Sequence, residues 1–187
     1  MDTLKITKAD LNERNEYTAS RDLEFEGHIE IEANLGLVRI LGLITAKGRL
    51  GISAGSGIEA GEGISAGLGI KAGLGIKAGW GIFAGLGIKA TEGIFAGSGI
   101  EAGEGIEAGW GIEAGDGIKA GWGIEAGFQI LAKKTITAKF RIFAGLCIWR
   151  MPNEGELTIT AAEVKGPVAF GTVRILPAEQ PAEEKEP

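Results

Sequence analysis

The chain has 187 residues, a formal net charge of −6 and a pI near 5.0, which indicates an acidic, soluble protein of one domain with small caps. Its single cysteine, Cys147, excludes an intrachain disulfide and favours a reducing compartment. The sequence shows no signal-peptide pattern and no apolar run of membrane-spanning length. We therefore expect a cytoplasmic protein with no membrane partner.

The chain begins with a polar, aperiodic stretch, residues 1–22, which we interpret as a leader strand and N-terminal cap. From Leu23 onward, apolar and acidic residues alternate through EFEGHIEIEA, which predicts a half-buried strand with an acidic outer face. The apolar parity switches near Leu37 and Val38. One extra residue is enough for such a switch, so we predict a bulge or corner there.

Thirteen consecutive hexads of the pattern Gly-Ile-x-Ala-Gly-x fill residues 51–128 with almost no break. Ile and Ala lie two residues apart, so they share one face of a short strand and the residue between them points the other way. Gly-x-Gly then supplies a corner, since glycine accepts positive φ without steric cost. The repeat predicts an all-β fold, a single-stranded parallel β-solenoid over residues 23–150.

Two other interpretations of the glycine-rich repeat are disfavoured. Each glycine inside a helix costs about 0.5 to 1 kcal/mol relative to alanine, which accumulates over many copies and excludes a helical rod. A disordered linker has no need for a periodic apolar face.

The number of hexads in one coil is ambiguous from the period alone. Three-sided coils would stack residues eighteen apart, and two-sided coils would stack residues twelve apart. Spacing of twelve pairs Phe83 with Phe95 and Trp110 with Trp122, but it also stacks several like charges, which is unfavourable between neighbouring strands. We favour three sides, with twelve-residue coils as the alternative.

Beyond Phe128 the Ile-x-Ala period continues to Ile148 with bulkier residues in place of glycine, as expected for terminal coils. Residues 151–176 contain a turn, MPNEG, and two strand-like runs, so they are predicted to form a C-terminal β cap. Residues 177–187 form a Pro/Glu tail that is predicted to be disordered.

The middle residue of Gly-x-Gly is tryptophan or leucine in some hexads and Glu or Asp in others. Because an unpaired acidic side chain is costly to bury, we predict that this position is an exposed corner tip. The tryptophans there either bind a partner or cover the flank of a thin core.

Charge falls into two belts along the chain. Residues 99–128 hold six acidic side chains and one lysine, whereas residues 129–150 hold five basic side chains and no acidic one. The acidic belt and the corner tryptophans are the predicted partner-binding residues: Glu101, Glu104, Glu107, Glu113, Asp116, Glu125, Trp80, Trp110 and Trp122. The basic belt is the predicted oligomer contact: Lys133, Lys134, Lys139, Arg141 and Arg150.

These belts have three interpretations. They can keep a solenoid soluble, they can imitate the regularly spaced phosphates of DNA, or they can join copies of the chain through complementary charge. Direct nucleic-acid binding is disfavoured, because the basic belt lies beside an equal and opposite charge.

The sequence offers no catalytic constellation. His28 is the single histidine and lies on the outer face of an early strand, and Cys147 has no second cysteine or nearby histidine with which to bind metal. The glutamates repeat along the chain and do not form an isolated pair of the glycosidase type. We therefore expect no enzyme activity, no metal and no cofactor.

Three classes of protein bear a resemblance to these residues. The hexads share a period with hexapeptide acyltransferases, but the position two before each Ile is Trp, Leu, Glu, Asp or Ser, and the coils lack those enzymes' histidine. EFEGHIEIEA and the Gly-Ile-x-Ala hexads resemble bactofilin-type β-helices, which implies a non-catalytic scaffold assembled end to end. GWGIEAG and RIFAGLCIWR resemble small β-helical proteins of phages and mobile elements, some of which block bacterial immune nucleases.

The sequence thus favours a non-catalytic binding protein that uses its acidic and aromatic side chains to engage a macromolecular partner. The finer hypothesis is an inhibitor of phage type that acts as a DNA mimic, anti-CRISPR-like, on a nucleic-acid-handling host complex. The alternative is a bactofilin-like, self-assembling scaffold.

Overall fold

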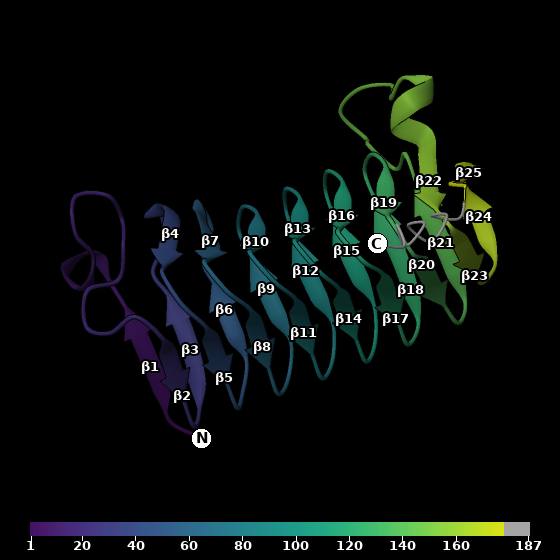
Figure 1. The fold of residues 1–187 in the computed structure, drawn as a ribbon. Helices are drawn as coiled ribbons and strands as arrows, with labels where there is room; N and C mark the ends of the chain where they lie inside the picture. Colours follow the sequence, from purple (N-terminus) through teal and green to yellow (C-terminus); the bar gives the residue numbers. More distant parts are fainter. Residues whose placement is uncertain (178–187) are drawn as a thin grey trace, which may run out of the picture.

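The computed structural model of the chain is a three-sided, parallel β-solenoid whose coils stack in one row from β1 to β25 (Figure 1). The structure describes residues 1–177, so the predicted tail lies outside the described residues except for Pro177. Three parallel sheets form the three sides, and each full coil of the chain contributes one strand to each sheet. The predicted fold class and the preference for three sides are confirmed.

Each sheet has one strand per coil. Sheet 1 consists of β1 (Thr3–Ile6), β3 (His28–Ile31), β6 (Leu50–Ile52), β9 (Ile70–Ala72), β12 (Ile88–Ala90), β15 (Ile106–Ala108), β18 (Gly123–Ala126), β21 (Arg141–Ala144) and β24 (Val168–Phe170). Sheet 2 consists of β2 (Leu23–Phe25), β5 (Ile44–Ala46), β8 (Ile64–Ala66), β11 (Ile82–Ala84), β14 (Ile100–Ala102), β17 (Ile118–Ala120), β20 (Thr135–Ala138) and β23 (Glu163–Lys165). Sheet 3 consists of β4 (Gly36–Ile40), β7 (Ser56–Ala60), β10 (Ile76–Ala78), β13 (Ile94–Ala96), β16 (Ile112–Ala114), β19 (Ile130–Ala132), β22 (Thr158–Ala161) and β25 (Thr172–Ile175). Two short 3-10 helices, η1 (Lys8–Asp10) and η2 (Glu154–Leu157), lie in excursions from the coils.

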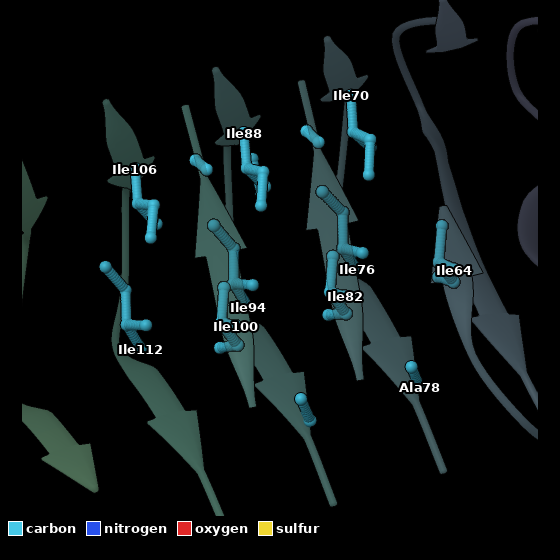
Figure 2. Close-up of a cluster of buried hydrophobic side chains, with 14 of the residues drawn as sticks. Ile64, Ile70, Ile76, Ala78, Ile82, Ile88, Ile94, Ile100, Ile106 and Ile112 are labelled. Atoms are coloured by element: carbon cyan, nitrogen blue, oxygen red, sulfur yellow. The ribbon is translucent and has the colours of Figure 1, made fainter. Parts of the chain in front are cut away.

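The core is a set of isoleucine and alanine columns. From Ile58 to Ala126 every hexad isoleucine is at most 2 % exposed and every hexad alanine at most 8 % exposed. Figure 2 shows these isoleucines repeating from coil to coil inside the three walls. Identical residues pair across coils, since Ile76 lies between Ile58 and Ile94 in the register of sheet 3. The regular burial of Ile and Ala follows directly from the two-residue alternation of the strands.

The coils change length along the chain. Paired positions are twenty residues apart from Val38 to Ile58 and eighteen apart from Ile58 to Ile76. The first predicted hexad, at residues 51–56, is therefore not a regular one, because the chain turns at Gly55 with φ of 73° and Ala54 is exposed. The predicted corner near residue 37 lies slightly earlier, where Asn34 and Gly36 have φ of 60° and 69°.

Most corner glycines are required by close packing between coils, and the expectation that they supply positive φ is wrong for most of them. Within residues 51–128 only Gly55 has positive φ. A Cβ added to Gly97 or Gly103 would lie 2.0 or 2.1 Å from a carbonyl oxygen of the preceding coil. The glycine that follows alanine thus lets successive coils approach closely. The glycine that precedes isoleucine has more room, since a Cβ on Gly99 would lie 3.5 Å from the nearest oxygen.

The C-terminal part departs from the predicted continuation of the period. The chain leaves the coil at Gly145, which has φ of 89°, and returns at Thr158. Ile148 therefore lies outside the solenoid and is 94 % exposed, so the prediction that it continues the buried column is wrong. The strands predicted for the C-terminal cap do form, and β22, β23, β24 and β25 extend the three sheets by further parallel strands.

Candidate functional site

The three edges of the solenoid each carry one column of corner residues, eighteen residues apart. These columns follow from the backbone ladder at the corners, in which the corner N–H of one coil donates to the corner carbonyl of the coil before it. The edge between sheets 2 and 1 carries Leu68, Leu86, Glu104, Trp122 and Phe140. The edge between sheets 1 and 3 carries Leu74, Glu92, Trp110 and Phe128, and the edge between sheets 3 and 2 carries Glu62, Trp80, Ser98, Asp116 and Lys134.

The three predicted tryptophans are exposed, but each lies on a different edge. Trp80, Trp110 and Trp122 are 58 %, 45 % and 54 % exposed. Because Trp110 and Trp122 are twelve residues apart in an eighteen-residue coil, they do not stack on one edge. The corner-tip position itself is as predicted.

The six acidic residues of the predicted belt are also distributed around the solenoid. Glu101 lies on sheet 2, Glu113 on sheet 3, and Glu107 and Glu125 stack on each other on sheet 1. Glu104 and Asp116 lie on two different edges. Their order along the chain therefore does not produce one acidic row on the surface.

Four of these acidic residues form ion pairs along the solenoid axis. Glu101 pairs with Lys119 and Glu107 with Lys89, each at 2.6 Å, while Asp116 pairs with Lys134 and Glu125 with Arg141, each at 2.7 Å. Two of these pairs, Asp116–Lys134 and Glu125–Arg141, join the acidic belt to the basic belt, whereas Lys89 and Lys119 lie outside the basic belt. Such exposed pairs contribute little to stability, typically about 0.2 to 1 kcal/mol each.

The predicted basic belt does not form one contact surface either. Lys133 and Lys134 lie at the edge between sheets 3 and 2, whereas Lys139 and Arg141 flank Phe140 at the edge between sheets 2 and 1. Arg150 lies in the excursion of residues 145–157, which we call the C-terminal loop.

A compact set of contacts holds the C-terminal loop. The Arg150 guanidinium donates two hydrogen bonds to the Glu156 carboxylate and lies 4.4 Å from the centroid of the Phe128 ring. Trp149 packs edge-on against the same ring. The Arg150 guanidinium and the Asn153 N–H together lower the pKa of Glu156 to about 2.

A groove with a volume of about 850 Å³ runs along sheet 1. We call it the flank groove. One wall is the edge column of Leu68, Leu86, Glu104, Trp122 and Phe140, and the other is the outward column of Lys71, Lys89, Glu107 and Glu125. Arg141, which pairs with Gly123, lines the C-terminal end of the groove. Its floor is the glycine that precedes each isoleucine, at positions 69, 87, 105 and 123.

The local sequence explains why a groove forms here. Glycine has no side chain, so each Gly-Ile pair leaves a gap between the corner tip and the outward residue of the strand. Eighteen-residue stacking then aligns four such gaps into one channel parallel to the solenoid axis. Where an outward phenylalanine is present the gap is closed, because the ring of Phe83 lies 2.5 Å from a Cβ built on Gly81.

The two ends of the flank groove differ in polarity. Toward the N-terminal end it is lined by Arg49 and Lys71, neither of which forms an ion pair within residues 1–177. Toward the C-terminal end its wall is aromatic, since Trp122 is 54 % and Phe140 is 56 % exposed. Between the two ends, Lys89 pairs with Glu107 and Arg141 pairs with Glu125.

The flank groove joins predicted and unpredicted residues. It includes Glu104, Glu107, Glu125, Arg141 and Trp122 from the predicted sets. Sequence reasoning missed Leu68, Leu86 and Phe140, although the eighteen-residue spacing that places them with Trp122 is visible once the coil length is known.

The other chemically notable side chains have structural partners. His28 Nδ1 accepts a hydrogen bond from the Arg49 N–H at 2.8 Å, which joins two neighbouring coils. Cys147 is a half-buried free thiol in the C-terminal loop. Glu59 lies between Lys77 and Arg39 on sheet 3, and hydrogen bonding to these cations lowers its pKa.

No group of three or more His, Cys, Asp or Glu side chains is placed to hold a metal ion within residues 1–177. In the same range, neither helix has the length and apolar character that crossing a membrane would require. Comparison of the chain with protein families, curated proteins and solved structures gave no match.

Proposed function

We propose that this chain is a non-catalytic binding protein that holds a protein partner in the flank groove. The observation that carries the proposal is the alignment of two columns along the groove: an edge column that is apolar except at Glu104, and an outward column of mixed charge. Concave surfaces with apolar walls and a few polar groups are the usual form of binding sites.

The chemistry of the groove favours a polypeptide over a nucleic acid. Backbone N–H and C=O groups of inner strands such as β12 and β15 pair with the strands on either side, so side chains must do the recognition. Leu86, Trp122 and Phe140 can pack against apolar side chains, and exposed aromatic residues are enriched among those that dominate protein interfaces. Nucleic-acid binding requires a consistently positive surface, whereas this groove carries both signs.

The finer hypothesis of a DNA mimic would require a continuous acidic row, and the six acidic residues of the predicted belt do not form one. The six acidic residues lie on different sides, and four of them are paired with cations. An inhibitor of a nucleic-acid-handling host complex therefore rests on the resemblance to phage proteins alone, and the groove proposal does not depend on it.

The test is affinity capture of a partner from a bacterial lysate with the full chain and matched tryptophan variants. Trp122→Ala combined with Leu86→Ala should weaken capture at least about tenfold, since truncating a central aromatic residue of an interface commonly costs about 2 kcal/mol. The control is Trp80→Ala, which removes the same side chain from the same Gly-Trp-Gly context on another edge.

Retention of the partner by the Trp80 variant and loss by the groove variant would support the site. Equal capture by all three proteins, or a larger loss with Trp80→Ala, would contradict it. Circular dichroism of each variant checks that the solenoid is intact, as expected for side chains that are about half exposed.

A further inference from the structure

Exposed apolar side chains are concentrated at the C-terminal end of the solenoid. Of the seventeen large hydrophobic residues that are exposed, eight lie within residues 140–175. They are Phe140, Leu146, Ile148, Trp149, Met151, Phe170, Val173 and Ile175. Phe140 belongs to the flank groove and four others to the C-terminal loop, whereas Phe170, Val173 and Ile175 lie on the last strands. Exposed apolar surface of this kind usually marks an interaction site.

Two of these residues belong to the core columns and are exposed because no strand follows them. Val173 pairs with Ile159, which is fully buried, yet Val173 is 41 % exposed. Ile175 likewise pairs with Ala161, which is fully buried, and is 58 % exposed. The core is therefore open at this end of the rod (Figure 1).

The backbone is open at the same end. Within residues 1–177, β23, β24 and β25 are the last strands of their three sheets, so in that range each presents one edge without a neighbouring strand. Such an edge is a template for pairing with another chain.

The N-terminal end differs, because its core residues are buried and one of its three end strands, β4, is covered. Ile6, Leu23 and Val38 in its first strands are only 1 %, 2 % and 0 % exposed. The segment of residues 7–22 covers the edge of β4, where the Tyr17 N–H donates to the Arg39 carbonyl at 2.9 Å and the Arg39 N–H donates to the Asn15 carbonyl at 2.8 Å. The two ends of the molecule are thus not complementary to each other.

The last ten residues of the sequence supply no large apolar side chain. Residues 178–187 contain four glutamates and one lysine, and no Val, Leu, Ile, Met, Phe, Trp or Tyr.

We propose that the open C-terminal end binds the same end of a second copy and forms a closed, two-fold dimer. Each copy can cover the other, because both present apolar core residues at the same spacing and strand edges that are free to form hydrogen bonds. A two-fold axis perpendicular to the solenoid reverses the sense in which the chain circulates, so facing edges run antiparallel and can form hydrogen bonds. The N-terminal ends, whose core residues are buried, then point outward.

This interface is separate from the flank groove, whose residues lie on the side of the rod. The dimer is therefore a longer rod with two flank grooves, and the contact at the middle of this rod covers neither groove. The dimer and the proposed groove function can fail independently.

The test is light scattering of the full chain after gel filtration, from about 1 to about 100 µM, a range that brackets micromolar association. The expected mass at the upper end is twice the chain mass of 19.4 kDa. The double substitution V173E/I175E should raise the dissociation constant at least about tenfold, because it places charge in the apolar contact. The matched control is F83E/F95E, which alters two exposed side chains on the flank and should leave the dimer intact.

Three outcomes would overturn the dimer: a monomer at every concentration, an unchanged mass for V173E/I175E, or filaments in electron micrographs. Thermal unfolding followed by circular dichroism confirms that V173E/I175E still folds. A folded but monomeric V173E/I175E protein beside a dimeric F83E/F95E protein is the result that supports the interface.

Discussion

The middle of the solenoid and its C-terminal end place equivalent side chains in very different surroundings. One column of sheet 3 runs through Ile112, Ile130, Ile159 and Val173. The first three are fully buried, whereas Val173 is 41 % exposed. Position within the strand is the same in all four cases. What differs is whether another coil follows.

Whether a core side chain is buried in this fold therefore depends more on the coils on either side of it than on its own strand. Each coil contacts the coils before and after it, as expected for a repeat protein whose stability is a sum of repeat and interface terms. A substitution in the middle disturbs two interfaces between coils, and one at the end disturbs a single interface.

The largest expected effect comes from truncating equivalent core residues in the two regions. Ile112→Ala should lower the free energy of unfolding by about 2 to 5 kcal/mol, because it leaves a cavity between two coils. Val173→Ala should cost about 1 kcal/mol or less, since much of this side chain is already in water. Urea denaturation of both variants at low protein concentration measures the difference.

Equal losses in the two variants would contradict the comparison between the middle and the end. A loss of unfolding free energy in Val173→Ala that grows with protein concentration would instead refine the comparison, because a second copy would then cover Val173 as another coil does in the middle.

A smaller effect is expected from adding one methyl group at either glycine of a single corner. Gly97→Ala places a Cβ 2.0 Å from the Gly79 carbonyl oxygen and should cost about 1 to 3 kcal/mol through overpacking. Gly99→Ala meets its nearest oxygen at 3.5 Å and should be close to neutral, within about 0.5 kcal/mol. Thermal unfolding midpoints of the two variants compare the positions directly.

Thr91 shows that the first of these positions accepts a side chain at some cost in geometry. It replaces the glycine after Ala90, and its N–H lies 3.3 Å from the Ala72 carbonyl oxygen, compared with 3.0 Å for Gly85 and 3.1 Å for Gly97. Gly97→Ala and Gly99→Ala variants of equal stability would show that close approach of the coils is not what selects glycine.

The smallest effect on the whole fold is expected in the C-terminal loop. The pKa of Glu156 is lowered to about 2, so the ionised carboxylate favours the closed loop above its ordinary pKa near 4.5, and this contribution is lost as the pH falls toward 2. Trp149 fluorescence, obtained by difference from a Trp149→Phe variant, should report the opening of the loop between these values.

Glu156→Gln should open the loop at neutral pH and leave the unfolding transition of the solenoid unchanged. Trp149 fluorescence that is independent of pH in the unsubstituted chain would argue against a role for the Arg150–Glu156 pair.

Sequence reasoning established the fold because the repeat is strict. The alternation of Ile and Ala fixed the inner face of each strand, and the stacking of charges favoured eighteen-residue coils. It failed at Ile148, which keeps the period but is 94 % exposed. Periodicity cannot reveal that the chain turns out of the coil at Gly145, because that depends on contacts of the C-terminal loop with Phe128.

The candidate site was only partly predictable, for a geometric reason. Residues that are neighbours on the surface are eighteen apart in the sequence, so belts defined along the chain wrap around all three sides. Glu101 and Glu113 illustrate this, since they lie on different sheets although both belong to the acidic belt. Trp122 was identified from its exposure, but its neighbours Leu86 and Phe140 become visible only with the correct coil length.

The flank groove can be tested most directly by photo-crosslinking in the partner complex. A benzophenone amino acid at position 86, in place of Leu86, lies on the groove wall, and the same group in place of Ser98 lies on another edge. Crosslinks to the partner from position 86 and none from position 98 are the predicted result. Crosslinks from position 98 with none from position 86 would show that the partner binds elsewhere on the solenoid.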